Sequence, residues 1–299
     1  MFSGKCLATK LNKITSKTFA TSLKTLKLRI KSVGSIAKIT KAMKMVSSSK
    51  MRADLQRLEN GKNFGHGSVD KIFQTDTYMQ KKNHSENSNK ILYVPFTSDK
   101  GLCGGINSGI TREIKSIISK SPNRSQCGLY IIGDKGCTAL ARPFADILKK
   151  GVHDLVTPMN YTTAASIAHD ISLTANDYDK IVLVYNRFKS AVVTLITKTE
   201  LYPRKKFLDM MAFGKLYNQK MPDKPASNPA IYDLYIASNV YNAILNNLAS
   251  EQSARMTAME NASKNAKAIV EKLLLDYNKA RQAKITMELC EIISGASAV

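Results

Sequence analysis

The sequence contains no tryptophan, and few aromatic rings occur in its two long segments with a helical repeat. Single-stranded nucleic acids bind on aromatic platforms set among basic residues, and no motif typical of DNA or RNA binding is present. The net charge is nevertheless +22, so an anionic partner is expected. An acidic protein surface fits these features better than nucleic acid does.

Long apolar runs are also missing from the chain. About 20 consecutive apolar residues are needed to cross a bilayer, and no run approaches that length. We therefore expect any membrane association to be made only through partner proteins.

Residues that would carry catalysis or bind metal are sparse. The five cysteines are odd in number and include no Cys-x-x-Cys pair, so reduced thiols fit better than a disulfide framework. The four histidines are far apart, without the spacing of metal ligands, and no Ser/His/Asp arrangement indicates a nucleophile. The sequence predicts no catalytic residue, no metal site and no cofactor.

Acidic residues are absent before Asp54. The first 20 residues contain four lysines, with hydroxylated and apolar residues between them. This pattern is typical of an organelle transit peptide, although such peptides usually carry arginine. We expect a mitochondrial presequence over residues 1–21; the alternative is a basic tail.

Two segments at the ends of the chain follow a helical repeat. The first, residues 23–58, has apolar residues at steps of three or four: Leu23, Leu26, Ile30, Val33, Ile36, Ile39, Met43 and Val46. The second, residues 231–294, contains neither proline nor glycine and would reach roughly 90 Å as a helix. Such stripes are typical of helices that lie along each other.

The middle of the chain has a different repeat. Three apolar runs predict buried strands at residues 91–97, 129–132 and 181–185. Helical patterns over residues 106–120 and 162–176 lie between them. The alternation predicts a small, mainly parallel α/β sheet.

Two further segments follow the third strand. Residues 191–202 alternate in character and are expected to add a strand by a hairpin. Residues 203–229 contain several prolines and little apolar content, so we expect a linker there.

We therefore predict an α/β fold in which the terminal segments pair as a long antiparallel two-helix coiled coil. A small, mainly parallel, Rossmann-like domain is inserted between them. The expected seam joins Leu26, Ile30 and Val33 to Met259, Ala262, Ala266, Ile269, Leu273, Tyr277 and Ala280. The predicted divisions are a presequence (1–21), an N-terminal coiled-coil helix (22–62), a helix extension and loop (63–90), the α/β domain (91–202), a linker (203–229) and a C-terminal coiled-coil helix (230–299).

Residues 97–105 read TSDKGLCGG, between a predicted strand and a predicted helix, where phosphate-binding loops occur. The loop matches neither G-x-G-x-x-G nor G-x-x-x-x-G-K-[ST], and the acidic residue expected for a ribose contact is missing. A tight turn with close packing is therefore favoured over nucleotide binding. Cys103 lies near the N-terminus of the predicted helix, where reactive thiols occur, but a buried structural thiol is favoured.

Four stretches of the chain carry a family resemblance. Residues 29–46 read RIKSVGSIAKITKAMKMV, residues 250–266 read SEQSARMTAMENASKNA, and the last 23 residues read YNKARQAKITMELCEIISGASAV. Together with TSDKGLCGG, these stretches closely resemble the gamma subunit of the F-type ATP synthase in its mitochondrial form. The resemblance covers essentially the whole chain from Leu23 to Val299, with the motifs in family order.

In that family the terminal helices form a coiled-coil shaft inside a hexamer of alternating alpha and beta subunits. The α/β domain lies at the foot, against the membrane c-ring and the small rotor subunits (delta and epsilon). Proton-driven rotation of the ring turns the shaft, which forces each beta site through successive conformations. The resemblance thus implies a non-catalytic central stalk subunit, peripheral to the matrix side of the mitochondrial inner membrane.

The resemblance also implies particular partner contacts. Met43 and Lys44 match the helix segment that meets an acidic lever of beta, while Arg281, Gln282, Thr286 and Glu288 match the segment that engages loops of alpha and beta. From the residues alone, Met43 would be an ordinary seam residue and Arg281 part of a solvated helix face.

Two other hypotheses remain open from the sequence. One is a basic nucleic-acid-binding coiled-coil protein, whose association would depend on salt. The other is an α/β nucleotide-binding enzyme that uses the loop near Gly101.

Overall fold

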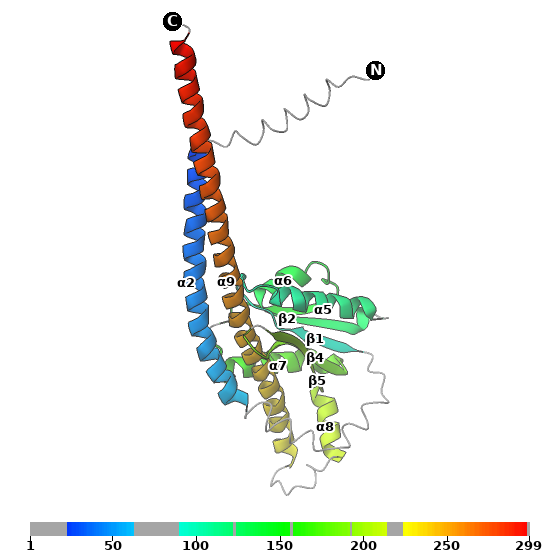
Figure 1. Cartoon of the computed structure of the whole chain (residues 1–299). Helices are drawn as coiled ribbons and strands as arrows, with labels where there is room; N and C mark the ends of the chain where they lie inside the picture. The colour runs from blue at the N-terminus through cyan, green and yellow to red at the C-terminus, as the bar shows by residue number, and fades with distance from the viewer. Residues whose placement is uncertain are drawn as a thin grey trace, which may run out of the picture. The chain divides into compact units, whose positions relative to one another are not determined.

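The computed structural model describes residues 23–62, 90–121, 124–155, 158–191, 193–213 and 224–297. The predicted presequence and almost all of the predicted loop at 63–90 lie outside these ranges. The chain divides into two compact units: Met45–Ala258, and a second unit that combines Met1–Lys44 with Met259–Val299. Figure 1 labels the helices and strands. The domain division predicted from the sequence stays a prediction.

A five-stranded sheet organises the unit Met45–Ala258. Its strands are β1 (Ile91–Pro95), β2 (Cys127–Ile132), β3 (Leu148–Val152), β4 (Lys180–Phe188) and β5 (Thr194–Leu201), in the order β3-β2-β1-β4-β5. The first four strands are parallel, and β5 returns antiparallel to β4, with Ile181 opposite Leu201. The mainly parallel sheet and its hairpin strand are therefore confirmed. Strand β3 was not predicted.

Helices cover both faces of this sheet. They are α5 (Ile106–Lys120), α6 (Asp134–Leu140) and α7 (Tyr161–Thr174), with short 3-10 turns η2 (Arg124–Gln126) and η3 (Ala175–Asp177). Alternate residues of β1 point to opposite faces, as the strand repeat requires. Tyr93 joins the cluster of α5, whereas Leu92 and Val94 join the cluster of α7.

The second of these cores includes the beginning of the long C-terminal helix. Helix α9 (Lys224–Ala296) has 73 residues and contains Pro229. Its buried residues Ile236, Val240 and Ala243 belong to the cluster that contains Leu92 and Val94. The first part of α9 is therefore an integral part of the α/β core.

Helix α8 (Arg204–Phe213) lies where we predicted a linker. Phe207 is only 1% exposed, and its ring centroid lies 5.2 Å from that of Tyr232 and 5.1 Å from that of Tyr235. Residues 204–213 of the predicted linker are therefore helical, and the large aromatic side chain of Phe207 provides burial that the average composition of the segment did not suggest.

The other unit consists of two paired helical segments. Helix α2 (Leu23–Lys62) contributes its part up to Lys44, and α9 contributes its part from Met259. Figure 1 shows the beginning of α2 beside the orange part of α9. The buried positions in this pair are Leu26, Thr40, Met259, Ser263 and Ala266. The coiled-coil architecture predicted from the sequence is confirmed.

The seam differs in detail from the predicted stripe. Ile36 and Ile39 are 51% and 59% exposed, and Val46 and Ile269 are exposed as well. Two consecutive steps of three residues lead from Val33 to Ile36 and then to Ile39. Together they place Ile39 about 120° around the helix from Val33, so Ile39 does not face the partner helix as Val33 does. Steps of four and three lead instead to Ala37 and Thr40, which are partly and fully buried.

Candidate functional site

The predicted contact residues Met43 and Lys44 lie at one level of the paired segments. The Lys44 Nζ lies 3.1 Å from Glu260 Oε2, and Glu260 Oε1 lies 3.4 Å from Lys264 Nζ. Hydrogen bonding from Lys44, followed by that from Lys264, holds the pKa of Glu260 below its usual value. Met43 is partly buried, as expected of a seam residue, while Lys44 keeps part of its side chain exposed.

Sequence reasoning missed Glu260. Its spacing of four residues from Lys264 is the arrangement of a favourable ion pair on a helix, and that signal was available. Its pairing with Lys44, which lies 216 positions earlier in the chain, could not be read from any local spacing.

The other four predicted contact residues lie on the last turns of α9. Arg281, Gln282, Thr286 and Glu288 are all exposed. Thr286 Oγ1 donates to the Gln282 carbonyl oxygen at 3.0 Å, and Lys284 pairs with Glu288 at 3.4 Å. A spacing of seven residues places Arg281 and Glu288 on one face of the helix.

The six predicted residues therefore form two groups. At 1.5 Å per residue, Arg281 lies about 30 Å along α9 from Glu260, the partner of Lys44. The structure does not bring the six together into one site.

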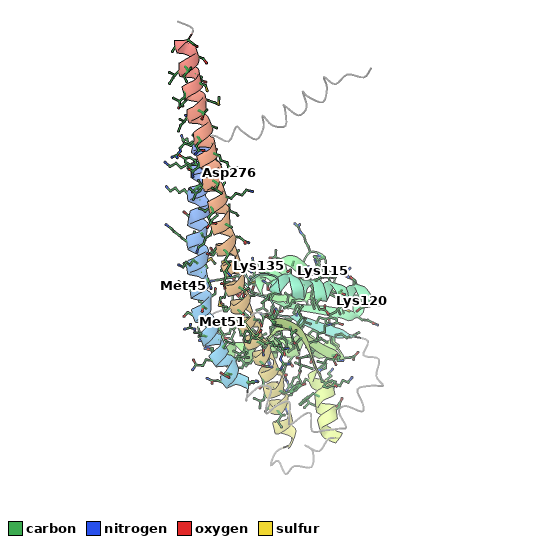
Figure 2. The ribbon with its side chains drawn as sticks, viewed as in Figure 1. Met45, Met51, Lys115, Lys120, Lys135 and Asp276 are labelled. Carbon is green, nitrogen blue, oxygen red and sulfur yellow. The ribbon has the colours of Figure 1, made fainter. Side chains whose placement is uncertain are left out.

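The end of α9 also exposes large apolar side chains. Ile285, Met287, Leu289, Ile292 and Ile293 are 49–67% exposed. In Figure 2, side chains project from all sides of this end of the helix. Large apolar side chains exposed in this number are typical of a surface that binds partner proteins.

The TSDKGLCGG loop follows β1 and lies against the start of α6. Thr97 Oγ1 donates to the Ile132 carbonyl oxygen at 2.9 Å and accepts from the Gly136 N–H at 2.9 Å. Gly133 has a φ of +102°, and a Cβ there would collide with the Thr97 carbonyl group. Only glycine fits this close crossing of two backbones.

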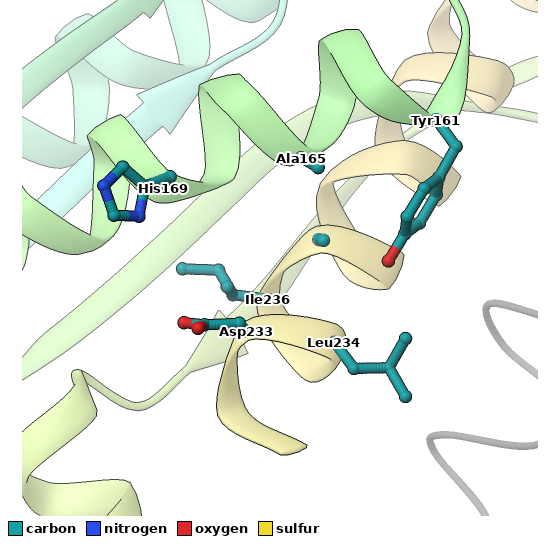
Figure 3. Close-up of a pocket in the computed structure, with 7 residues that line it drawn as sticks. Tyr161, Ala165, His169, Asp233, Leu234 and Ile236 are labelled. Atoms are coloured by element: carbon teal, nitrogen blue, oxygen red, sulfur yellow. The ribbon is translucent and has the colours of Figure 1, made fainter. Parts of the chain in front are cut away.

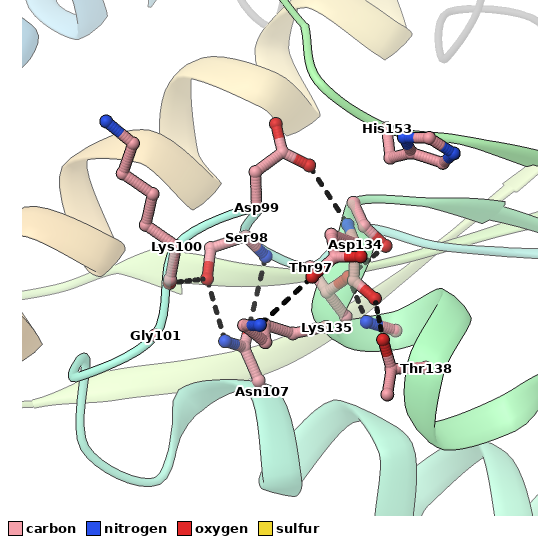
Figure 4. Close-up of polar contacts among 12 residues, drawn as sticks. Thr97, Ser98, Asp99, Lys100, Gly101, Asn107, Asp134, Lys135, Thr138 and His153 are labelled. Atoms are coloured by element: carbon pink, nitrogen blue, oxygen red, sulfur yellow. Dashed lines mark hydrogen bonds and ion pairs between the residues drawn. The ribbon is translucent and has the colours of Figure 1, made fainter.

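Asp99 lies in the TSDKGLCGG loop, and its carboxylate is bound by backbone N–H groups of the protein. Its carboxylate accepts from the Asp134 N–H at 2.9 Å (Figure 4). It also accepts from the Leu155 N–H at 3.3 Å. In open α/β sheets, ligands bind at the carboxyl ends of the strands where the strand order reverses, here between β1 and β4. The two donors to Asp99 lie instead after β2 and after β3, so Asp99 ties the loop to the neighbouring segments of the sheet, which favours the packing interpretation of the loop.

Cys103 is buried in this loop. Asn107 Nδ2 donates to Cys103 Sγ at 3.2 Å and to Ser98 Oγ at 2.7 Å. The surroundings of Cys103 are those of the buried structural thiol that the sequence favoured.

A hollow of about 340 Å³ lies between α7 and α9 in the α/β unit (Figure 3). Its lining is mostly apolar, with Tyr161, His169 and Asp233 as its polar side chains. Phosphates are held by cationic side chains and backbone N–H groups, whereas the Asp233 carboxylate would repel them, so the lining of this hollow does not suit a nucleotide.

Neither a cluster of metal ligands nor a membrane-spanning helix occurs among the residues that the structure describes. Among the described residues, no three His, Cys, Asp or Glu side chains gather as ligands of a metal ion would. None of the described helices combines the length and the hydropathy that crossing a bilayer requires.

Comparison with known proteins agrees with the motifs. The family model described as ATP synthase matches residues 22–299. The "ATP synthase gamma chain" of Geobacter sp. (strain M21) is 36% identical over 287 residues, which is 93% of this chain and 99% of that protein. The "ATP synthase subunit gamma, mitochondrial" of Ipomoea batatas is 36% identical over 284 residues, which is 91% and 83% of the two chains.

Solved structures give the same result. A chain of the Tetrahymena thermophila mitochondrial ATP synthase central stalk and c-ring is 47% identical, with a TM-score of 0.69, over 75% of this chain and 99% of that chain. A chain of the Euglena gracilis mitochondrial ATP synthase is 20% identical with a TM-score of 0.74, over 92% and 94% of the two chains, and shares the fold. The resemblance found in the sequence motifs is confirmed: this chain belongs to the ATP synthase family, among its gamma subunits.

Proposed function

We propose that this protein is the central stalk subunit of an F-type ATP synthase. In this role it transmits proton-driven rotation of a membrane c-ring to catalytic beta subunits and thereby couples proton transport to ATP synthesis. The 47% identity to a Tetrahymena central stalk chain and the similarity to gamma chains over more than nine-tenths of the sequence support this proposal.

The observation that carries the proposal is the exposed end of α9. From Arg281 to Ala296 every side chain of the helix is exposed, and many of them are large and apolar. Such a surface is stabilised when partner subunits surround it. Apolar contacts are also non-directional, so they allow the helix to turn within its surroundings more readily than a set of specific hydrogen bonds would.

Rotation acts on the beta subunits without any chemistry by this chain. A turning, asymmetric surface presents different contacts to each beta site in succession, and those differences shift each site between its conformations. The protein is therefore a non-catalytic subunit of a proton-transporting complex.

We propose that the contacts with the alpha and beta subunits occur at two levels. Lys44 and Met43 meet an acidic segment of beta, and the excess positive charge of the chain favours this partner. Arg281, Gln282, Thr286 and Glu288 offer donors and acceptors to loops of alpha and beta near the end of α9. The small rotor subunits and the c-ring contact the α/β domain.

The proposed location is the matrix side of the mitochondrial inner membrane, to which the chain binds only through its partners. Support comes from the acid-free N-terminus, which is typical of a transit peptide, and from mitochondrial relatives. We propose that residues 1–21 are removed after import.

Affinity purification of the tagged chain from mitochondria tests the proposal. We expect the alpha, beta, small rotor and c-ring subunits to be recovered with it. Recovery of nucleic acid in a salt-dependent manner without a beta subunit, or ATP hydrolysis by the isolated chain, would contradict it.

A further inference from the structure

The buried guanidinium group of Arg255 holds helix α9 near the end of its contact with the α/β domain. We call this planar set of N–H donors the arginine fork. Arg255 and Glu251 are each 8% exposed. Arg255 Nη2 donates to Glu251 Oε1 at 2.6 Å, and Arg255 Nη1 donates to Gln252 Oε1 at 3.2 Å. The same guanidinium group reaches the carbonyl oxygens of Lys100 and Gly101 at 3.3 and 3.4 Å. Arg255 therefore links α9 to the TSDKGLCGG loop.

This loop is fixed relative to the sheet. Ser98 Oγ donates to the Lys100 carbonyl oxygen at 2.8 Å, and the Ser98 N–H donates to Asn107 Oδ1 at 3.0 Å. Leu102 has a φ of +63°. A residue other than glycine adopts this left-handed backbone conformation only when its surroundings impose it. The carbonyl groups that receive Arg255 thus have a set position.

A second set of contacts joins α9 to the end of β4 and the turn that follows it. Ser250 Oγ donates to the Asn186 carbonyl oxygen at 3.1 Å, and Asn186 Nδ2 donates to Asn247 Oδ1 at 3.2 Å. Ser253 Oγ donates to the Ala191 carbonyl oxygen at 2.6 Å. Two separate loops of the α/β domain therefore hold one short stretch of the helix.

We refer to these α9 side chains as the polar collar: Asn247, Ser250, Glu251, Ser253 and Arg255. Apolar packing, which dominates α9 before the collar, has no strict orientation. Hydrogen bonds weaken steeply when their angles change, and an arginine fork adds further geometric restriction. The collar is the part of this interface best suited to oppose turning of the helix about its own axis.

Stability alone is a weak explanation for the buried ion pair. Removing two charges from water is costly, and apolar side chains of similar size often serve stability equally well or better. Burial raises the pKa of Glu251, while the charge of Arg255 opposes this shift. A buried pair of this kind is better explained by the specific orientation that it imposes.

We propose that the polar collar fixes the rotational setting of α9 on the α/β domain and transmits twisting force between them. Arg255 is its central positioning residue. The collar ends close to Ala258, the last residue of the compact α/β unit, so it acts where α9 leaves that unit. This inference rests on the proposed stalk function.

The test uses the assembled ATP synthase in sealed vesicles, with ATP hydrolysis and ATP-driven proton uptake measured together. The variant Glu251→Leu/Arg255→Met keeps the site filled with apolar atoms but removes the ion pair and its bonds to the loop. We expect the complex to assemble and to hydrolyse ATP, while the protons pumped per ATP fall about threefold or more. Arg255→Lys, which keeps the charge but loses the fork, should give an intermediate loss.

A matched control is the variant Asp146→Leu/Arg124→Met. Arg124 Nη2 also donates to a carboxylate, Asp146 at 2.7 Å, and to a backbone carbonyl group, that of Pro143 at 2.6 Å. This pair is exposed, and neither bond involves α9. The same chemical change there should leave the pumping ratio unaltered.

An unaltered ratio in the assembled collar variant would overturn the inference. If that variant does not assemble, Ser250→Ala/Ser253→Ala decides, since it removes two collar hydrogen bonds and only two oxygen atoms; an unaltered ratio there also overturns the inference. If the complex containing the unchanged chain neither assembles nor pumps, the proposed stalk function has failed instead.

Discussion

The two parts of helix α9 show how differently one continuous helix is stabilised along its length. Before Met259, side chains such as Val240, Ala243 and Ile244 are buried in the core of the α/β domain. After Met259, only Ser263 and Ala266 are buried, and the last turns are exposed throughout. The first part depends on its own chain for burial, whereas the second depends on a narrow seam and, in the proposed function, on partner subunits.

This difference separates residues that stabilise the folded chain from residues that couple ATP hydrolysis to proton transport in the complex. Substitutions in the first part of α9 should unfold the chain, because they remove buried apolar contacts. Substitutions near the end should leave the folded chain unchanged and affect only the complex.

Ile244→Ala and Ile292→Ala make the same chemical change in the two parts of α9. Ile244 is 3% exposed and Ile292 is 67% exposed. We expect Ile244→Ala to lower the free energy of unfolding by about 2–5 kcal/mol because it leaves a cavity, and Ile292→Ala to change it by less than about 0.5 kcal/mol. Urea unfolding of the purified chain, followed by circular dichroism, measures both; similar losses would contradict the comparison.

Gly133→Ala and Gly34→Ala compare the two compact units. At Gly133 a Cβ meets the Thr97 carbonyl group and φ is +102°, so we expect a loss of about 2–4 kcal/mol. At Gly34, within α2, nothing lies within 4 Å of the added Cβ. Alanine there should stabilise the helix by up to about 1 kcal/mol. Thermal unfolding of both variants measures these effects. Melting temperatures that shift in the same direction would contradict the opposite effects expected of the two substitutions.

The Lys44–Glu260 pair gives a smaller, pH-dependent effect. Since hydrogen bonding to Lys44 lowers the pKa of Glu260 below 4.5, ionised Glu260 stabilises the folded chain above that pH. This contribution is lost as the pH falls from about 4.5 through the lower folded-state pKa. The difference in unfolding midpoint between the unchanged chain and Glu260→Gln should therefore shrink over this range; a difference that does not depend on pH would exclude the pair as its cause.

Ending the chain after Ala280 should have the smallest effect on the stability of the isolated protein. The residues removed are exposed, so the unfolding midpoint should stay nearly constant. In the assembled enzyme, however, ATP hydrolysis and proton pumping should become less tightly coupled. Full coupling without residues 281–299 would show that this end of α9 transmits no force.

Much of the fold could be predicted from the sequence because it depends on local repeats. The long helices and the strands at β1, β2 and β4 have strong patterns. Strand β3 reads Leu-Lys-Lys-Gly-Val and lies at an exposed edge of the sheet, so it lacks an apolar pattern. Helix α8 contributes the buried ring of Phe207, although the segment as a whole has little apolar content.

Tertiary contacts were harder to foresee. The seam of α2 runs through Ala37 and Thr40 because the partner helix lies close there, and the apolar stripe alone did not reveal this register. Arg255 and Gly101 are separated by 154 positions, so no local spacing indicates their contact. The motifs predicted the family, whereas the contacts of Arg255 with the TSDKGLCGG loop could be found only in the structure.

Rotation of this chain within a single complex is the most direct test of the proposed function. A reporter can be attached at Lys120→Cys, on the exposed surface of α5 (Figure 2), after the exposed Cys290 is replaced by serine. With the alpha and beta subunits immobilised, addition of ATP should turn the reporter continuously in one direction. Steady ATP hydrolysis with a stationary reporter would contradict the account.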